Sequence, residues 1–180
     1  PEILVKKEEV KYAIENNADE IDICINRGLF LQGNKDAVAQ EVREIKYLIE
    51  SSNKNIKLKV ILEVGELVSF KNIFQASVLC LENGADFIKT STGKIEKGAD
   101  IYSTIVMLLA IREYYHKTGV LKGVKVAGGI KTAEEAILYN NLYKYFITSN
   151  FDNTHFRIGC SQLFEKIKEI IVEQLGVEES

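Results

Sequence analysis

The sequence has few of the residues that interrupt or cross-link a chain. Its 180 residues contain one proline, three cysteines and no tryptophan. Cys24, Cys80 and Cys160 are odd in number and widely spaced, and none belongs to a CxxC motif, so neither a disulfide framework nor a zinc knuckle is indicated. We expect them to be small buried residues of a protein from a reducing compartment, the cytoplasm.

Long apolar runs and an excess of positive charge are also lacking. No uninterrupted apolar stretch reaches the ~18 residues of a membrane span, so no membrane partner is expected. The formal net charge of −3 argues against a nucleic-acid partner, because binding a phosphate backbone requires a basic face. His116 and His155 have no partner at ligand spacing, so the sequence predicts no metal site.

What is present is an alternation of β-rich runs with segments of helical period, over a composition that is 46% hydrophobic and 27% charged. This pattern is typical of a single α/β domain with a parallel sheet, here assigned to residues 1–180. The expected strands are Glu20–Ile25, Lys57–Glu63, Asp86–Thr90, Gly123–Ala127 and Phe156–Gly159. Helices are expected around Lys7–Asn16, Val38–Ile49, Ile101–Tyr115 and Ser161–Gln174. Asn141–Phe146 is either a short helix or an irregular connection ahead of a polar loop, Ser149–His155.

One face of each expected strand is polar, which distinguishes a barrel from an open sheet. A period of two places Asp22 opposite Ile21 and Ile23, and Lys59 opposite Leu58 and Val60. Lys89 and Lys125 follow the same rule on the next two strands. Parallel strands buried on both faces are normally apolar throughout. A polar face on four successive strands therefore favours one enclosed polar site, as in the interior of a (β/α)8 barrel.

Lys89 closes a strand and opens the hydroxyl- and glycine-rich loop Thr90–Lys94. In barrels the C-terminal strand ends carry the active site. A lysine held there beside apolar walls and another cation can lose its proton near neutral pH and attack a carbonyl. The alternative is a lysine whose amine reaches the surface from a strand end.

Lys125 lies one strand later and is expected to point to the same side as Lys89, so that each lysine depresses the pKa of the other. A structural ion pair of Lys125 with Glu63 or Asp22 is the alternative. Asp22 is expected to pair with either lysine or to relay a proton. The alternative is that Asp22 is only a salt-bridge partner.

Two glycine-containing turns are candidates for phosphate binding. Gly128 and Gly129 allow the backbone to approach an anion, and Thr132 with Glu135 forms a capping box at the start of the following helix. The segment Gly159–Ser161 repeats the arrangement after the last strand, where barrels commonly bind phosphate. The alternative for each is a tight turn between strand and helix.

On these residues the chain resembles the 2-deoxyribose-5-phosphate aldolases, from about Asn17 to Ile170. The matching strings, in that family's order and spacing, are Ala18–Asp22, Leu58–Glu63, Ala85–Lys94 and Lys125–Gly129. The resemblance implies that Lys89 is a Schiff-base lysine, that Lys125 lowers its pKa, and that Asp22 relays protons. It implies substrate contacts, most of them to phosphate, for Lys59, Thr92, Gly93, Lys94, Gly128, Gly129, Lys131, Gly159 and Ser161.

The implied reaction is the reversible cleavage of 2-deoxy-D-ribose 5-phosphate to acetaldehyde and D-glyceraldehyde 3-phosphate, without a metal or cofactor. The implied partner is a small phosphorylated sugar, and a homo-oligomer stays open. Two rivals are another phosphate-binding barrel enzyme that forms no imine, and a non-catalytic relative that keeps the phosphate site.

The resemblance also places Asp22 on the fourth strand of a barrel. The chain is then the C-terminal five-eighths of a (β/α)8 barrel that lacks roughly the first three strands, and about 70 residues are expected upstream. The last loop carries Gln162 where the family commonly has a second serine.

Overall fold

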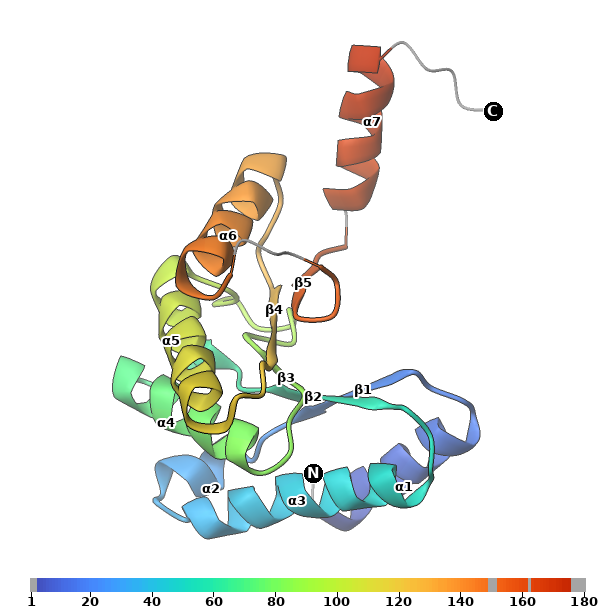
Figure 1. Ribbon diagram of the computed structural model, residues 1–180, viewed down its shortest axis with the longest axis vertical. Helices are drawn as coiled ribbons and strands as arrows, with labels where there is room; N and C mark the ends of the chain where they lie inside the picture. The colour runs from blue at the N-terminus through green and yellow to red at the C-terminus, as the bar shows by residue number, and fades with distance from the viewer. Residues whose placement is uncertain (1–2, 149–151, 162, 176–180) are drawn as a thin grey trace.

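The computed structural model describes residues 3–148, 152–161 and 163–175 (Figure 1). Helices and strands alternate along these residues. The helices are α1 (Ile3–Glu15), α2 (Arg27–Leu31), α3 (Lys35–Ser51), α4 (Phe70–Glu82), α5 (Ile101–Thr118), α6 (Ala133–Phe146) and α7 (Leu163–Leu175), with a 3-10 turn, η1, at Val64–Glu66.

Five parallel strands form one sheet in the order of the chain. They are β1 (Glu20–Cys24), β2 (Lys57–Ile61), β3 (Phe87–Lys89), β4 (Gly123–Ala127) and β5 (Phe156–Gly159). All five expected strands are present, although the first three end earlier than expected. The ladder continues briefly beyond β2, because the Leu62 amide donates to the Lys89 carbonyl oxygen at 2.9 Å, but Glu63 then adopts a left-handed conformation with φ 56°.

The core lies between the sheet and the helices that cover one of its faces. Ile23, Val60, Ile88 and Val124 are at most 7% exposed and pack in one cluster with apolar residues of α3, α4 and α5. In Figure 1 helices α3 to α6 follow this outer face, and α7 extends away from the body of the protein. The opposite face, called the inner face below, carries the polar residues. The arrangement is that of five strands of a (β/α)8 barrel, as the polar face predicted.

Three helical segments differ from the sequence expectation, and one of them is the short helix α2, which was not expected. The segment Asn141–Phe146 is the last part of α6, which runs unbroken from Ala133 because Tyr139 and Tyr143 are both buried on its core face. Helix α4 was not singled out. Its signals are Ser69, whose hydroxyl caps the helix by accepting the Asn72 amide at 3.2 Å, and apolar residues at helical spacing behind it.

No helix among the described residues is long and apolar enough to cross a membrane.

Candidate active site

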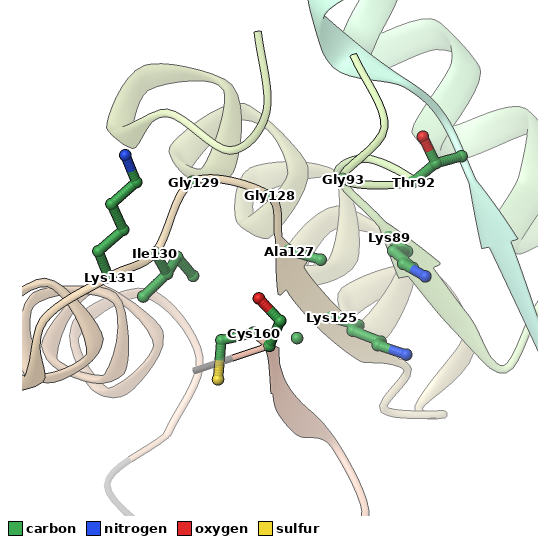
Figure 2. Close-up of a pocket in the computed structure, with 12 residues that line it drawn as sticks. Lys89, Thr92, Gly93, Lys125, Ala127, Gly128, Gly129, Ile130, Lys131 and Cys160 are labelled. Atoms are coloured by element: carbon green, nitrogen blue, oxygen red, sulfur yellow. The ribbon is translucent and has the colours of Figure 1, made fainter. Parts of the chain in front are cut away.

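Lys89, the last residue of β3, and Lys125, in the middle of β4, occupy neighbouring positions on these two strands. The two residues are paired in the register of these parallel strands, so their side chains leave the sheet on the same face. Figure 2 shows the two side chains ending side by side. Lys89 is 9% exposed, whereas Lys125 is half-buried. The expected alignment of the two lysines is therefore present.

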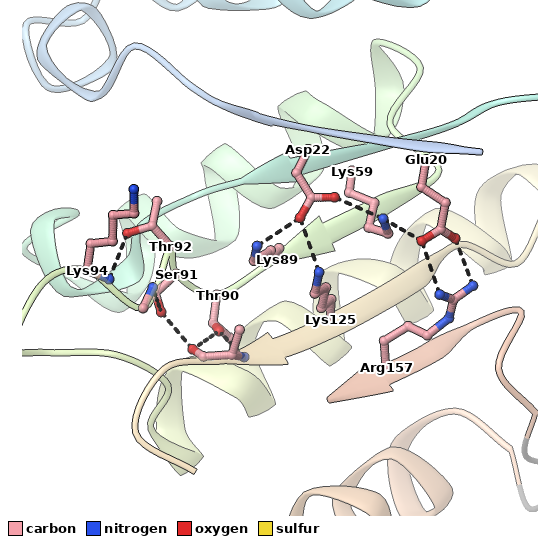
Figure 3. A network of polar contacts seen from close by, with 12 residues as sticks. Glu20, Asp22, Lys59, Lys89, Thr90, Ser91, Thr92, Lys94, Lys125 and Arg157 are labelled. Carbon is pink, nitrogen blue, oxygen red and sulfur yellow. Dashed lines mark hydrogen bonds and ion pairs between the residues drawn. The ribbon is translucent and has the colours of Figure 1, made fainter. Parts of the chain in front are cut away.

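Asp22 lies at the centre of a group of lysines on the inner face (Figure 3). Its Oδ2 atom accepts hydrogen bonds from Lys89 Nζ at 2.8 Å and from Lys125 Nζ at 3.2 Å. Its Oδ1 atom accepts one from Lys59 Nζ at 2.9 Å. Of the two ion pairs considered for Lys125, the structure forms the one with Asp22.

The charges of this group change the protonation of its members. Burial alone would raise the pKa of the Asp22 carboxyl, but hydrogen bonds from Lys89 and Lys59, together with the charges of Lys89 and Lys125, hold it well below its ordinary value. Burial lowers the pKa of Lys125; Asp22 opposes this shift and Lys89 adds to it. At neutral pH the site therefore holds an ionised carboxylate beside a lysine that loses its proton more readily than usual.

Two buried hydroxyls join the end of β3 to the end of β4. Thr90 Oγ1 donates to the Ala127 carbonyl oxygen and accepts from the Ala127 amide, both at 2.8 Å. Ser91 Oγ donates to the same carbonyl at 2.6 Å and accepts from the Gly93 amide at 3.2 Å. These bonds keep the strands that carry Lys89 and Lys125 in fixed relation. Both hydroxyls belong to the hydroxyl-rich loop that follows Lys89, but their bonds to Ala127 were not expected.

Glu63 is a buried carboxylate at the site, 2% exposed, at the left-handed position after β2. It accepts the Thr92 hydroxyl at 2.7 Å and lies within 3.3 Å of the Thr92 amide. The Thr92 oxygen in turn accepts the Lys94 amide at 3.2 Å. The Thr92 hydroxyl thus holds its own loop in place, and its contact with a substrate stays a prediction.

A cavity of about 430 Å³ opens beside the two lysines. Its lining includes all of the predicted site residues except Asp22, Lys59 and Lys94. In Figure 2 Lys131 lies at the opposite end of this cavity from Lys89. Lys59 is buried beneath the site, where it contacts Asp22, and Lys94 is exposed outside the cavity.

The turn after β4 has the backbone conformation that an anion site requires, but two of its amides are already bonded to a side chain. Gly128 and Gly129 have φ of 92° and 86°, a region that favours glycine. The expected capping box is present at Thr132 and Glu135. However, the Glu135 carboxylate accepts the amides of Lys131 and Thr132 at 2.7 and 3.2 Å. An anion at this turn would therefore be held by the glycine backbone and the Lys131 side chain rather than by those two amides.

The loop after β5 contains Cys160, whose exposure differs from the sequence expectation. Cys80 is buried and Cys24 is half-buried, but Cys160 is exposed, so the expectation of three buried cysteines is wrong for Cys160. Its side chain lines the cavity because the loop after β5 lies at the cavity wall. Gln162 lies outside the described residues.

Among residues 3–148, 152–161 and 163–175, no group of three His, Cys, Asp or Glu side chains is arranged to hold a metal ion. The charged residues that do gather are lysines around a carboxylate. A parallel β/α barrel sheet with paired lysines on neighbouring strands and a cavity beside them defines a lysine-based barrel protein of the aldolase kind.

Comparisons with known proteins agree with this class. The family model described as DeoC/LacD family aldolase matches residues 2–140, and the chain belongs to that family. The chain is 41% identical over 165 residues to the deoxyribose-phosphate aldolase of Mus musculus, covering 91% of this chain and 51% of that protein. The chain thus spans about half the length of that curated relative.

Two solved structures support the fold. A candidate deoxyribose-phosphate aldolase from Toxoplasma gondii ME49 aligns with a TM-score of 0.82 at 23% identity, over 98% of this chain and 69% of that one. The deoxyribose phosphate aldolase from Aeropyrum pernix, described as tetrameric, aligns with a TM-score of 0.72 at 26% identity, over 94% of this chain and 64% of that one.

Proposed function

We propose that the protein is a class I aldolase that cleaves 2-deoxy-D-ribose 5-phosphate reversibly to acetaldehyde and D-glyceraldehyde 3-phosphate through an imine on Lys89. The observation that carries this proposal is the sharing of one carboxylate oxygen, Asp22 Oδ2, by Lys89 and Lys125 next to the cavity. The family membership and the named relatives support it.

The chemistry follows from the nucleophile. The Lys89 amine adds to the aldehyde carbon of the open-chain sugar, and loss of water gives an iminium ion. When the hydroxyl proton on the third carbon is removed, the bond between the second and third carbons breaks, and its electron pair moves to the iminium nitrogen. Glyceraldehyde 3-phosphate leaves. The enamine is then protonated on carbon and hydrolysed, which releases acetaldehyde and restores the amine.

Asp22 and Lys125 have distinct tasks in this proposal. Lys89 must lose a proton before it can attack, and the amine of Lys125 is the nearby group with a lowered pKa. Because Asp22 Oδ2 accepts a hydrogen bond from each lysine, a proton that leaves one amine has a direct path to the other. Asp22 thus serves as the relay and Lys125 as the neighbouring cation.

The opposite end of the cavity suits the phosphate. Lys131 provides a cation there, and the turns at Gly93, Gly128 and Gly129 leave backbone close to the open space. A sugar phosphate bound in this orientation has its aldehyde beside Lys89. We also propose that the protein is cytoplasmic and that it forms a homo-oligomer. Light scattering measures the oligomeric state.

The direct test is incubation of the protein with 2-deoxyribose 5-phosphate and detection of both aldehyde products. Cleavage with imine trapping supports the proposal. Conversion to another sugar phosphate or loss of carbon dioxide, without any trapped imine, would instead assign an isomerase or a decarboxylase. Binding of the sugar phosphate without turnover would assign a non-catalytic relative.

The phosphate end gives a prediction for Gly129. Gly129→Asp should raise KM for 2-deoxyribose 5-phosphate about tenfold or more and change the reaction of unphosphorylated deoxyribose much less, because the new carboxylate faces the phosphate. Gly129→Asn is the matched control, since asparagine has the same shape, no charge and a similar tolerance of positive φ. Steady-state kinetics on both sugars measure this. Equal losses on both would mean that the loop is only a turn.

A further inference from the structure

Arg157 and Glu20 join the two edge strands of the sheet across its inner face. Arg157 lies on β5 and Glu20 on β1. Their contact is bidentate, with Nη2 2.8 Å from Oε1 and Nη1 3.1 Å from Oε2. Both side chains are about one third exposed or less, at 33% and 26%. Such paired bonds fix the orientation of a guanidinium more firmly than a single contact would.

Arg157 is also held from other sides. Its guanidinium carbon lies 5.5 Å from the centre of the Phe87 ring, and its Nε donates to the Asn153 carbonyl oxygen. The Phe87 ring itself lies over Gly123, where an added Cβ would meet ring atoms at 2.3 Å. The floor of the inner face is therefore built around the Phe87 ring, with Arg157 against it.

Glu20 connects this floor to the reactive lysines (Figure 3). It accepts Lys59 Nζ at 2.6 Å, and Lys59 donates on to Asp22 at 2.9 Å. Lys59 is 3% exposed, so its charge is shared between the two carboxylates with little help from water. Burial opposes ionisation of Glu20, but Lys59 and Arg157 lower the pKa of the carboxyl overall. Charges of alternating sign thus run from Arg157 through Glu20 and Lys59 to Asp22.

We propose that Glu20 and Arg157 are positioning residues of the aldolase site. Together they determine how strongly the Lys59 amine binds Glu20 rather than Asp22, and this balance sets the pH range in which Lys89 reacts. The inference rests on the proposed function, since it concerns the imine-forming amine. It adds two residues that do not line the cavity.

The physical reason is that Glu20 and Asp22 compete for the charge of Lys59. Without the charge of Glu20, Lys59 has Asp22 as its remaining carboxylate partner, and Asp22 holds the Lys89 proton less strongly. Without Arg157, Glu20 attracts Lys59 more strongly, and Asp22 is left to Lys89 and Lys125. Removing the two charges should therefore have opposite effects on proton loss at Lys89. The charged and titratable groups that face Lys89 or Glu20 are Asp22 and Cys24 from β1, Lys59 from β2, Glu63 beyond it, Lys125 from β4 and Arg157 from β5.

The experiment measures the rate of imine trapping by acetaldehyde and cyanoborohydride between pH 5 and pH 9. Glu20→Gln should move the acid limb of the profile to lower pH, and Arg157→Met should move it to higher pH. Each shift should be on the order of half a pH unit, as for one charge at the far side of a partly exposed site. The double variant should return near the wild-type profile. Arg157→Lys, which keeps the charge, should also stay near it, even if the rate falls.

The outcomes separate this inference from the proposed function. If the wild-type protein forms no adduct, the aldolase proposal fails first. If it does, and both single variants lose rate with no shift or with shifts in the same direction, the pair is merely structural and the inference is wrong. Should Arg157→Met fail to fold by circular dichroism, Glu20→Gln still decides, because a profile of that variant without a shift to lower pH would overturn the inference.

Discussion

Acetaldehyde followed by borohydride should leave a reduced two-carbon adduct on Lys89, and Lys89→Ala should abolish it. Turnover of 2-deoxyribose 5-phosphate should fall by on the order of 10⁴-fold or more, because the substitution removes the nucleophile itself. Mass spectrometry of the proteolytic peptides locates the adduct. Lys89 is 9% exposed and Lys125 is half-buried, so access alone would favour Lys125, and labelling of Lys89 would show a chemical preference.

Lys125→Leu is the matched variant for this experiment. Trapping should persist on Lys89 but require a higher pH, because an amine keeps its proton to higher pH once a neighbouring cation is removed. An adduct on Lys125 in the wild-type protein would exchange the two roles. If neither lysine is labelled while the protein binds the sugar phosphate, the imine mechanism is wrong.

The inner face could be predicted because it depends on local rules. The alternation of Asp22 with Ile21 and Ile23 follows from the period of a strand, and the parallel strand order follows from the helices between strands. The placing of Lys89 beside Lys125 needed only that both occupy polar positions on neighbouring parallel strands. Helix α4, which was not expected, could also have been predicted from a local rule, since Ser69 signals its start.

The pairing of charges could not be predicted in the same way. One carboxylate, Asp22, serves three lysines, and which lysine reaches which oxygen depends on strand register and sheet curvature. The contact of Glu20 with Arg157 joins residues 137 positions apart, and no local pattern connects them. The exposure of Cys160 likewise depends on where the loop after β5 meets the cavity.

Asp22→Asn should damage both catalysis and stability. Turnover should fall by about 100-fold or more, within the range that a positioned proton acceptor contributes. The free energy of unfolding at pH 7 should fall by about 1–3 kcal/mol, because lysines on the inner face lose their shared carboxylate; the side chain is 25% exposed, so water screens part of the loss. Asp19→Asn, which changes an exposed carboxylate three residues earlier, should have little effect on either quantity.

The pH dependence of this stability loss has a definite sign. The folded-state pKa of Asp22 lies below its ordinary value, so its ionised form stabilises the folded protein. That contribution is complete above the ordinary carboxyl pKa of about 4 and is lost as the pH falls through the lower folded value. Urea unfolding should therefore show a wide gap between wild type and Asp22→Asn at pH 7 that narrows below about pH 4. A gap independent of pH would mean that the lysines do not stabilise the Asp22 carboxylate, and the charge arrangement proposed for proton transfer would then lose its basis.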